Sequence, residues 1–377
     1  MTSTDGTGPL ATMFDPITLR GVTARNRIWV PALCQYSVLA RDGVPTDWHL
    51  AHLGSFAMGG AGMVMAEATA VVPEGRISPH DTGIWNDAQA TAWSRIVGFV
   101  HSQGALAGLQ LAHAGRKASV YPEWGFEQKG SIPLDAPADV DPGQGWETVS
   151  ASDLAFAAYR APRALAVDEL PGLIAAFASG ARRAVNAGFD VVELHAAHGY
   201  LLHQFLSPLS NTRADAYGGP LESRARLLLE VVRAVRAELG ESVPLLVRFS
   251  ASDYAEGGWD AAQTATVAGW AHEAGADLFD ISSGGLISGV RIPLGPGYQV
   301  PFAEQVRETA DVAVSAVGLI TEVAQAAAIV ESGQADAVML GREMMRDPHF
   351  PLRAAHELGV ELDYWPPQYV RAKWPEP

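Results

Sequence analysis

The stretch Phe189-Asp-Val-Val-Glu-Leu-His-Ala-Ala-His-Gly-Tyr200 decides how the rest of the chain is interpreted. Its first part, residues 189–195, is a short run dominated by Val, Leu and Phe, which is typical of a strand buried on both faces of a parallel sheet. Two histidines, a glycine and a tyrosine lie at its end. Polar residues at the end of a buried parallel strand predict a functional site at the carboxyl ends of the strands.

Seven other apolar runs resemble this one, and helical patterns lie between them. Eight strands alternating with helices predict an α/β fold of the closed (β/α)8 type, a TIM barrel. The alternative is a doubly wound sheet, which needs a glycine fingerprint after its first strand, and Pro31-Ala-Leu-Cys-Gln-Tyr36 contains no glycine. The predicted strands are residues 27–31, 62–67, 105–111, 189–195, 244–250, 277–282, 312–317 and 335–341.

Three of the intervening helices have clear end signals. We expect Asp168 to cap a helix that ends at Gly188, and Thr321 to cap one that ends before Gly333. A third helix is predicted over residues 227–239, closed by the glycine that follows.

Two segments depart from the strand–helix repeat. Residues 14–26 read as a β-hairpin that precedes the first strand and closes the barrel floor. Residues 119–163, after the third strand, are rich in Pro, Gly and Asp, and a loop of this length in a compact domain predicts a lid over the site. We therefore divide the chain into a flexible terminus (1–12), one barrel domain (13–360, with the lid at 119–163) and a tail (361–377).

Composition excludes several classes of protein. The 377 residues are 48% hydrophobic, enough for one large core, and the net charge of −16 argues against nucleic acid and anionic membranes as partners. Cys34 is the single cysteine, so neither an intrachain disulfide nor a cysteine-ligated cluster can form. Without a secretory signal or a membrane-length apolar run, the expected location is the cytoplasm.

The two histidines suggest the chemistry. His195 and His198 can both donate hydrogen bonds to one oxygen, and Tyr200 can supply a proton next to it, which is how an enzyme polarises a carbonyl group and protonates the neighbouring atom. The competing interpretation is a metal-dependent hydrolase that uses Glu193 with the two histidines. The chain lacks both a His-x-His pair and a His-Glu-x-x-His helix, so that interpretation is the weaker one.

Other strand ends predict a phosphate-bearing cofactor. Gly318, after Val317, and Gly341, before Arg342, let backbone N–H groups approach an anion, and Ser283 and Gly284 extend the same cradle.

For each of three further residues, the sequence leaves two roles open. Arg248 is either paired with a carboxylate such as Glu193 or is a fixed cation beside a cofactor. Gln110 either meets an imide-like ring or bonds to backbone, and Cys34 is either a reactive thiol or a small buried hydrophobe.

At this point the sequence resembles a family, the old yellow enzymes, which are FMN-dependent ene-reductases, and within it the thermophilic-like subgroup. The resemblance runs from about Phe14 to Trp374, and its long lid resembles that of the xenobiotic-reductase branch. The matching stretches are Phe14-Asp-Pro-Ile, Cys34-Gln-Tyr36, Glu67-Ala68, Gln110-Leu-Ala-His-Ala-Gly-Arg-Lys117, His195-Ala-Ala-His-Gly-Tyr200, Phe205-Leu-Ser-Pro-Leu-Ser-Asn211, Tyr217-Gly-Gly219, Arg248, Gly341-Arg342 and Asp347-Pro348.

The resemblance implies a role for each site residue. FMN would be reduced by NADPH or NADH and would pass hydride to the β-carbon of an activated alkene. His195 and His198 would bind the carbonyl, Tyr200 would protonate the α-carbon, Cys34 would lie near the flavin, and Tyr36 would close the pocket. The tail's Arg371 would reach the site of a neighbouring subunit in a homodimer or homotetramer. The residues implied to bind FMN are Ala32, Leu33, Cys34, Ala68, Gln110, Arg248, Ser283, Gly284, Val317, Gly318, Gly341 and Arg342.

Overall fold

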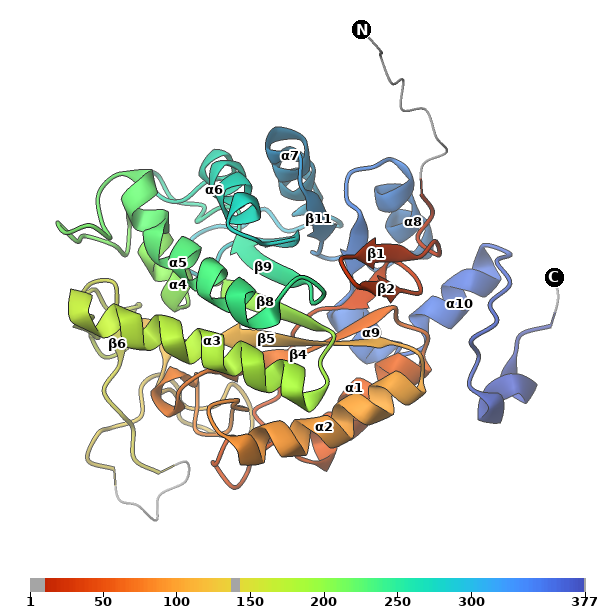
Figure 1. The fold of residues 1–377 in the computed structure, drawn as a ribbon, viewed down its shortest axis with the longest axis horizontal. Helices are drawn as coiled ribbons and strands as arrows, with labels where there is room; N and C mark the ends of the chain where they lie inside the picture. Colours follow the sequence, from red (N-terminus) through yellow and green to blue (C-terminus); the bar gives the residue numbers. More distant parts are fainter. Residues whose placement is uncertain (1–10, 137–142, 376–377) are drawn as a thin grey trace, which may run out of the picture.

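The computed structural model describes residues 11–136 and 143–375, and within them the predicted barrel is confirmed. Eight parallel strands close into one ring, with helices outside it (Figure 1). All eight predicted segments form a strand of this ring. In spatial order the strands are β10 (Leu278–Ser282), β11 (Ala313–Ala316), β12 (Ala337–Met339), β3 (Ile28–Val30), β4 (Met63–Ala70), β5 (Leu106–Ala112), β8 (Val191–Ala196) and β9 (Leu245–Ser250).

Long amphipathic helices pack their apolar faces on the ring. They are α1 (Asp47–Met58), α2 (Asp87–Ser102), α3 (Leu170–Ala187), α5 (Leu221–Leu239), α6 (Ala261–Glu273), α7 (Val300–Ala310) and α8 (Val323–Glu331). Shorter helices are α4 (Leu201–Leu206), α9 (Arg342–Arg346) and α10 (Phe350–Glu357), and the 3-10 turns are η1 (Pro73–Gly75), η2 (Gly115–Lys117), η3 (Val167–Glu169) and η4 (Pro367–Ala372).

Two predicted N-caps are wrong. Asp168 lies inside η3, and Glu169 occupies the cap position of α3. Glu322, not Thr321, precedes α8. Side-chain identity alone does not choose the cap here, because each helix is preceded by another polar residue that suits its start. The predicted C-terminus is confirmed at Gly188, whose φ of 98° is the left-handed conformation that a residue with a Cβ rarely adopts.

The predicted hairpin forms and closes the amino-terminal end of the barrel. Its strands β1 (Ile17–Leu19) and β2 (Val22–Ala24) pair antiparallel. Apolar side chains of the hairpin pack against a buried cluster from the barrel strands that includes Trp29, Met63 and Leu246. The interior of the barrel is thus filled from below, which leaves the carboxyl ends of the strands for the site.

Aspartates at the amino-terminal end fix the strand register at three places. Asp190, Asp277 and Asp336 each stand directly before a strand and accept a hydrogen bond from the backbone of the neighbouring strand. The three donors are Ala107 N at 2.8 Å, Leu245 N at 2.7 Å and Val314 N at 2.9 Å. A one-residue slip would break each bond, so these carboxylates hold the ring in its register.

The predicted lid segment lies at the other end, and residues 137–142 within it fall outside the described chain. A short parallel pair, β6 (Val149–Ser150) and β7 (Arg163–Ala164), organises its later part. Ser150 Oγ donates to Gln204 Oε1 at 2.8 Å. Arg116, in η2, donates to Leu154 O of the lid at 3.2 Å and to Leu286 O at 2.8 Å, so it links the lid to the loop after β10.

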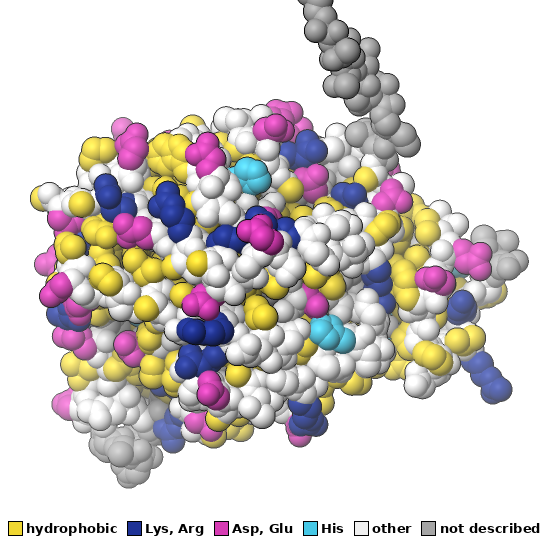
Figure 2. All heavy atoms as spheres, viewed as in Figure 1, with side chains coloured by type: hydrophobic (Ala, Val, Ile, Leu, Met, Phe, Trp, Pro, Cys, Tyr) yellow, Lys and Arg dark blue, Asp and Glu magenta, His cyan; other side chains and the backbone are white. Residues whose placement is uncertain are grey.

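The face shown in Figure 2 is mixed in character: acidic and basic side chains are interspersed with hydrophobic ones. None of the helices in the described chain is long and apolar enough to cross a membrane.

Asp277 is the most connected of the three register aspartates, which gives a test of their role. Besides Leu245 N it binds Arg236 Nη2 at 2.6 Å and Arg20 Nε at 2.5 Å. We expect Asp277→Asn to lower the free energy of unfolding by about 2 to 4 kcal/mol, because the largely buried Arg236 loses its charged partner and Arg20 keeps only the exposed Glu241. Urea denaturation followed by circular dichroism measures it.

Glu241→Gln is the matched control, because Glu241 binds the same Arg20 at 2.8 Å but its side chain is 94% exposed. We expect it to cost less than about 1 kcal/mol. Equal destabilisation by the two variants would contradict the proposed register role.

Candidate active site

A cavity of about 280 Å³ opens at the carboxyl ends of the strands. Its wall combines residues from the ends of six barrel strands or the loops after them. Predicted site residues in the lining are Leu33, His198, Arg248, Ser283, Val317, Gly318, Gly341 and Arg342. Further lining residues include Pro31, Ser282, Tyr298, Gln299 and Thr321. The structure therefore brings together most of the residues that the sequence assigns to a phosphate-bearing cofactor.

Two features of this wall suit a phosphate. Gly318 has φ of 121°, and a Cβ built there would lie 2.8 Å from Gln299 Nε2, so only glycine fits. Arg342 is exposed at the rim, and no carboxylate pairs with it in the part of the chain that is described. A free guanidinium beside close-approaching backbone is the donor set that phosphate requires. The residues present therefore fit FMN.

Arg248 supplies a buried positive charge at the cavity floor. Its Nε lies 2.7 Å from Asp280 Oδ2, and both side chains are almost fully buried. The expected partner, Glu193, is instead held by Gln110, whose Nε2 donates to Glu193 Oε1 at 2.7 Å. Arg248 is thus paired with a carboxylate, one of its two predicted roles, but with Asp280 rather than Glu193, and Gln110 bonds to a carboxyl group rather than to backbone.

The carboxyl groups around Arg248 are difficult to ionise. Burial, together with the charge of Asp280, raises the pKa of Glu193 to about 8, and Arg248 acts in the opposite direction. Burial also raises the pKa of Asp280. Arg248 favours the ionised form of both carboxyl groups and so opposes the effect of burial on each.

The two imidazoles lie next to each other above this floor. His198 Nδ1 is 3.4 Å from His195 Nε2, and the ring planes are perpendicular. Ala197 N donates to His195 Nδ1 at 3.3 Å, and His198 Nε2 is 2.8 Å from Ser282 Oγ. Burial and the charge of Arg248 hold the pKa of both rings well below 6.5. Both histidines are therefore neutral hydrogen-bonding groups rather than cations.

Tyr200 lies against His195 with ring centroids 4.8 Å apart. It belongs to an apolar cluster that also holds Cys34 and Tyr36. Burial and the nearby Cys34 raise the pKa of the phenol well above 10, so Tyr200 keeps its proton across the neutral range. Tyr36 also contacts the lid, because its ring centroid lies 4.8 Å from that of Trp124.

Cys34 is half-buried and carries no sign of activation. Burial and the carboxyl groups of Glu67 and Asp81 raise the pKa of its thiol well above 9.0. The thiol is therefore protonated at neutral pH, and Cys34 is not poised as a nucleophile.

Some predicted site residues do not line the cavity. The residues outside its wall are Ala32, Cys34, Tyr36, Ala68, Gln110, His195, Tyr200 and Gly284, of which Ala68 and Tyr200 border a second, small pocket. Arg371 is exposed in η4, away from the cavity of its own chain. Its approach to a neighbouring subunit, like the oligomeric state, stays a prediction.

The sequence alone gave no role to Gln299. Its Oε1 accepts a hydrogen bond from Ser283 Oγ at 2.6 Å, and its Nε2 donates one to Val317 O at 3.1 Å. The sequence feature that could have indicated it is the long segment, rich in Gly and Pro, between the strand that ends at Ser282 and the helix that begins at Val300. Lys117 stands in the matched Gln110–Lys117 stretch, yet it too received no role.

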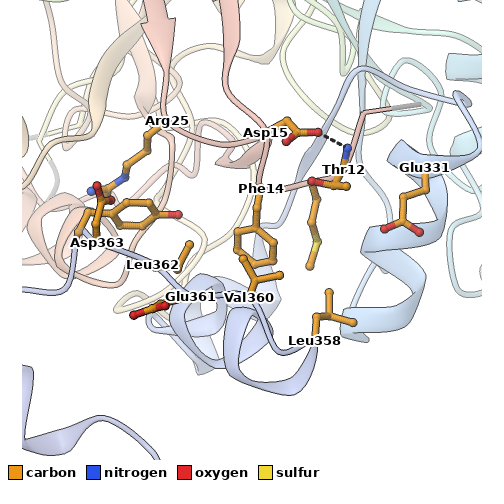
Figure 3. Close-up of a pocket in the computed structure, with 12 residues that line it drawn as sticks. Thr12, Phe14, Asp15, Arg25, Glu331, Leu358, Val360, Glu361, Leu362 and Asp363 are labelled. Carbon is orange, nitrogen blue, oxygen red and sulfur yellow. Dashed lines mark hydrogen bonds between the residues drawn. The ribbon is translucent and has the colours of Figure 1, made fainter. Parts of the chain in front are cut away.

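Neither the metal alternative nor a second, wider cavity offers another site. Among the described residues, no group of three His, Cys, Asp or Glu side chains is placed to hold a metal ion. The second cavity, about 740 Å³, lies beyond the amino-terminal end of the strands, between Phe14, Arg25 and the segment from Leu358 to Tyr364 (Figure 3). It contains neither the histidines nor Tyr200.

Comparison with known proteins agrees with the geometry. The NADH:flavin oxidoreductase / NADH oxidase family matches residues 12–361. An NADPH dehydrogenase of Listeria innocua is 44% identical over 364 residues, which are 96% of this chain and 99% of that protein. An NADPH dehydrogenase of Geobacillus thermodenitrificans is 44% identical, over 95% of this chain and 98% of that one.

Solved structures show the same fold. Morphinone reductase matches with a TM-score of 0.76 and 30% identity, covering 97% of this chain and 94% of its own. The old yellow enzyme homologue of Zymomonas mobilis matches with a TM-score of 0.75 and 28% identity, covering 97% and 99%.

Family, relatives and fold therefore agree with the flavin site built from the residues. This chain belongs to the NADH:flavin oxidoreductase / NADH oxidase family, as an FMN-dependent NADPH oxidoreductase of the old yellow enzyme type.

Proposed function

We propose that this oxidoreductase reduces the C=C bond of alkenes conjugated to a carbonyl group, such as enones, enals and maleimides. The observation that carries the proposal is the pair of neutral imidazoles whose nitrogens lie 3.4 Å apart, with the Tyr200 ring directly beside them. Two donors and a proton source at this spacing suit a substrate with an oxygen at one end and a carbon to be protonated two atoms away. Bound FMN, reduced by NADPH, supplies the hydride.

The histidine tautomers decide whether both rings can donate. Because Ala197 N–H donates to Nδ1 of His195, the proton of that ring is on Nε2. In the present arrangement Ser282 Oγ lies 3.3 Å from Gln299 Oε1 and can donate to it. If the hydroxyl turns to donate to His198 Nε2 instead, the proton of His198 moves to Nδ1. Both N–H groups then face the gap between the rings, where a carbonyl oxygen can accept from each.

Protonation is assigned to Tyr200. As hydride reaches the β-carbon, negative charge develops on the α-carbon and the carbonyl oxygen. The histidines stabilise the oxygen, and the Tyr200 O–H bond breaks as the new C–H bond forms. The phenolate that remains recovers its proton from solvent.

The lid contributes to the substrate side of the site. Trp124 packs against Tyr36, and Trp146 Nε1 donates to Glu74 O at 2.8 Å. The lid is therefore attached to the same loops that carry the site, and we assign to it the exclusion of water and part of the substrate specificity.

Alkene reduction by the holoenzyme tests the proposed function directly. We expect anaerobic NADPH to bleach the bound flavin, and cyclohexenone to restore the oxidised spectrum with formation of cyclohexanone. Cyclohexene, which has no carbonyl for the histidines, is the control and should leave the flavin reduced. Reoxidation by oxygen but by none of a panel of enones, enals and maleimides would refute the proposal.

Tyr200→Phe separates proton transfer from flavin reduction. We expect the rate of flavin reduction by NADPH to stay within about twofold, because hydride arrives without the phenol. Reoxidation by cyclohexenone should slow by about 10²-fold or more, the usual contribution of a positioned acid. Stopped-flow absorbance measures both rates. Equal slowing of the two half-reactions would argue against a proton-donor role.

The lowered histidine pKa values predict that the reoxidation rate changes little as the pH falls below 7. A lowered pKa keeps an imidazole neutral below its usual value of 6.5, so neither His195 nor His198 gains a proton between pH 7 and about pH 5.5. The reoxidation rate of pre-reduced enzyme with cyclohexenone should then change less than about twofold over that range. A change with a midpoint near pH 6.5 would show that a histidine titrates in the site.

A further inference from the structure

Lys117 is a largely enclosed cation to which the proposed chemistry assigns no task. It ends η2, directly after the strand that carries Gln110, and its side chain is only partly accessible. The two hydrogen bonds of its ammonium go to carbonyl oxygens, His198 O at 2.9 Å and Gly285 O at 3.1 Å. The amine therefore bridges the loop after β8 and the loop after β10.

The bridged loops meet at two glycines and have almost no spare room. A Cβ on Gly199 would lie 2.4 Å from Gly285 O, and a Cβ on Gly285 would lie 2.7 Å from His198 Cα. His198 itself has φ of 57°, an uncommon conformation for a residue other than glycine. Lys117 accordingly anchors the strained turn that sets the direction of both His198 and Tyr200.

The same ammonium faces the proton donor. Its nitrogen is 5.2 Å from the centroid of the Tyr200 ring and 4.5 Å from that of Phe156, a lid residue. A cation over an aromatic face is attracted to the ring, and it is attracted more strongly to the phenolate formed when the hydroxyl proton has left. Burial lowers the pKa of Lys117 to about 8, so the amine is mostly charged at pH 7.

From these contacts we propose that Lys117 is a positioning residue for proton transfer: it fixes the His198–Tyr200 turn against the loop after β10 and stabilises Tyr200 once the phenol has given up its proton. The inference rests on the proposed alkene reduction. The covalent step is unchanged, because the Tyr200 O–H bond breaks, the C–H bond forms at the α-carbon, and solvent returns the proton.

Two substitutions separate the charge from the packing. Lys117→Met keeps most of the volume and removes the charge and both hydrogen bonds, whereas Lys117→Arg keeps a cation that can reach the carbonyl oxygens. Arg95→Met is the control for loss of a surface cation, because Arg95 is exposed on the outer helix α2, outside the site and the lid. All are measured as FMN-loaded enzyme, with flavin content and circular dichroism confirming the fold.

We expect Lys117→Met to slow flavin reoxidation by cyclohexenone about tenfold, with kcat rather than KM affected. Flavin reduction by NADPH should stay within about twofold, and the solvent deuterium isotope effect on reoxidation should rise, because proton transfer becomes more rate-limiting. Lys117→Arg should recover most of the rate, and Arg95→Met should match the wild type.

Other outcomes count against the inference. Wild-type rates in Lys117→Met, or equal slowing of both half-reactions, would overturn it. If Lys117→Met does not retain FMN, the two rates and the isotope effect are measured on Lys117→Gln, which can still donate to one carbonyl, and the same results support or overturn the inference. Failure of the proposed function is distinct, because in that case the wild-type enzyme itself reduces no alkene.

Discussion

A positive charge sealed inside the barrel governs the chemistry of this site. Arg248 lies on β9, whose other residues are mostly Leu, Val and Phe. An unpaired guanidinium in these surroundings would be very costly. Asp280, on the adjacent strand, lies 2.7 Å from it and makes the burial possible. The charge in turn disfavours protonation of both imidazoles above it, so the site works with neutral donors. Removing either partner would leave a buried charge uncompensated. It would also shift the pKa values of the groups that face the cavity floor.

Most of the other polar side chains around the site are uncharged hydrogen-bonding groups. Gln110 occupies one carboxyl oxygen of Glu193, Ser282 links His198 to Gln299, and Lys117 binds carbonyl oxygens rather than carboxylates. Such an arrangement tolerates a developing negative charge on a substrate without holding one in the resting enzyme. Cys34 and Tyr200 both retain their protons, because burial disfavours their anionic forms and the carboxyl group of Asp81 acts in the same direction on both.

How much of this could be predicted from sequence depended on the kind of signal. The eight strands were predictable because strands buried on both faces leave short apolar runs such as residues 189–195, and the barrel then placed their ends together. The partner of Arg248 was not, because the strands of Glu193 and Asp280 both neighbour β9, and only the register, in which Asp280 stands opposite Arg248, decides between them. The caps at Asp168 and Thr321 failed because a neighbouring glutamate begins each helix. Gln299 belongs to a loop whose course no periodic pattern describes.

The register aspartates and the catalytic loops occupy opposite ends of the same strands, and this separation has a consequence for how the protein can change. Asp190, Asp277 and Asp336 hold the ring at the end where no chemistry occurs, while the lid meets the site mainly through residues such as Trp124 and Phe156. Variation in residues 119–163 can therefore alter which molecules enter without loosening the scaffold. A lineage of such enzymes can diversify its substrates at one rim, because mutations there leave the opposite rim intact.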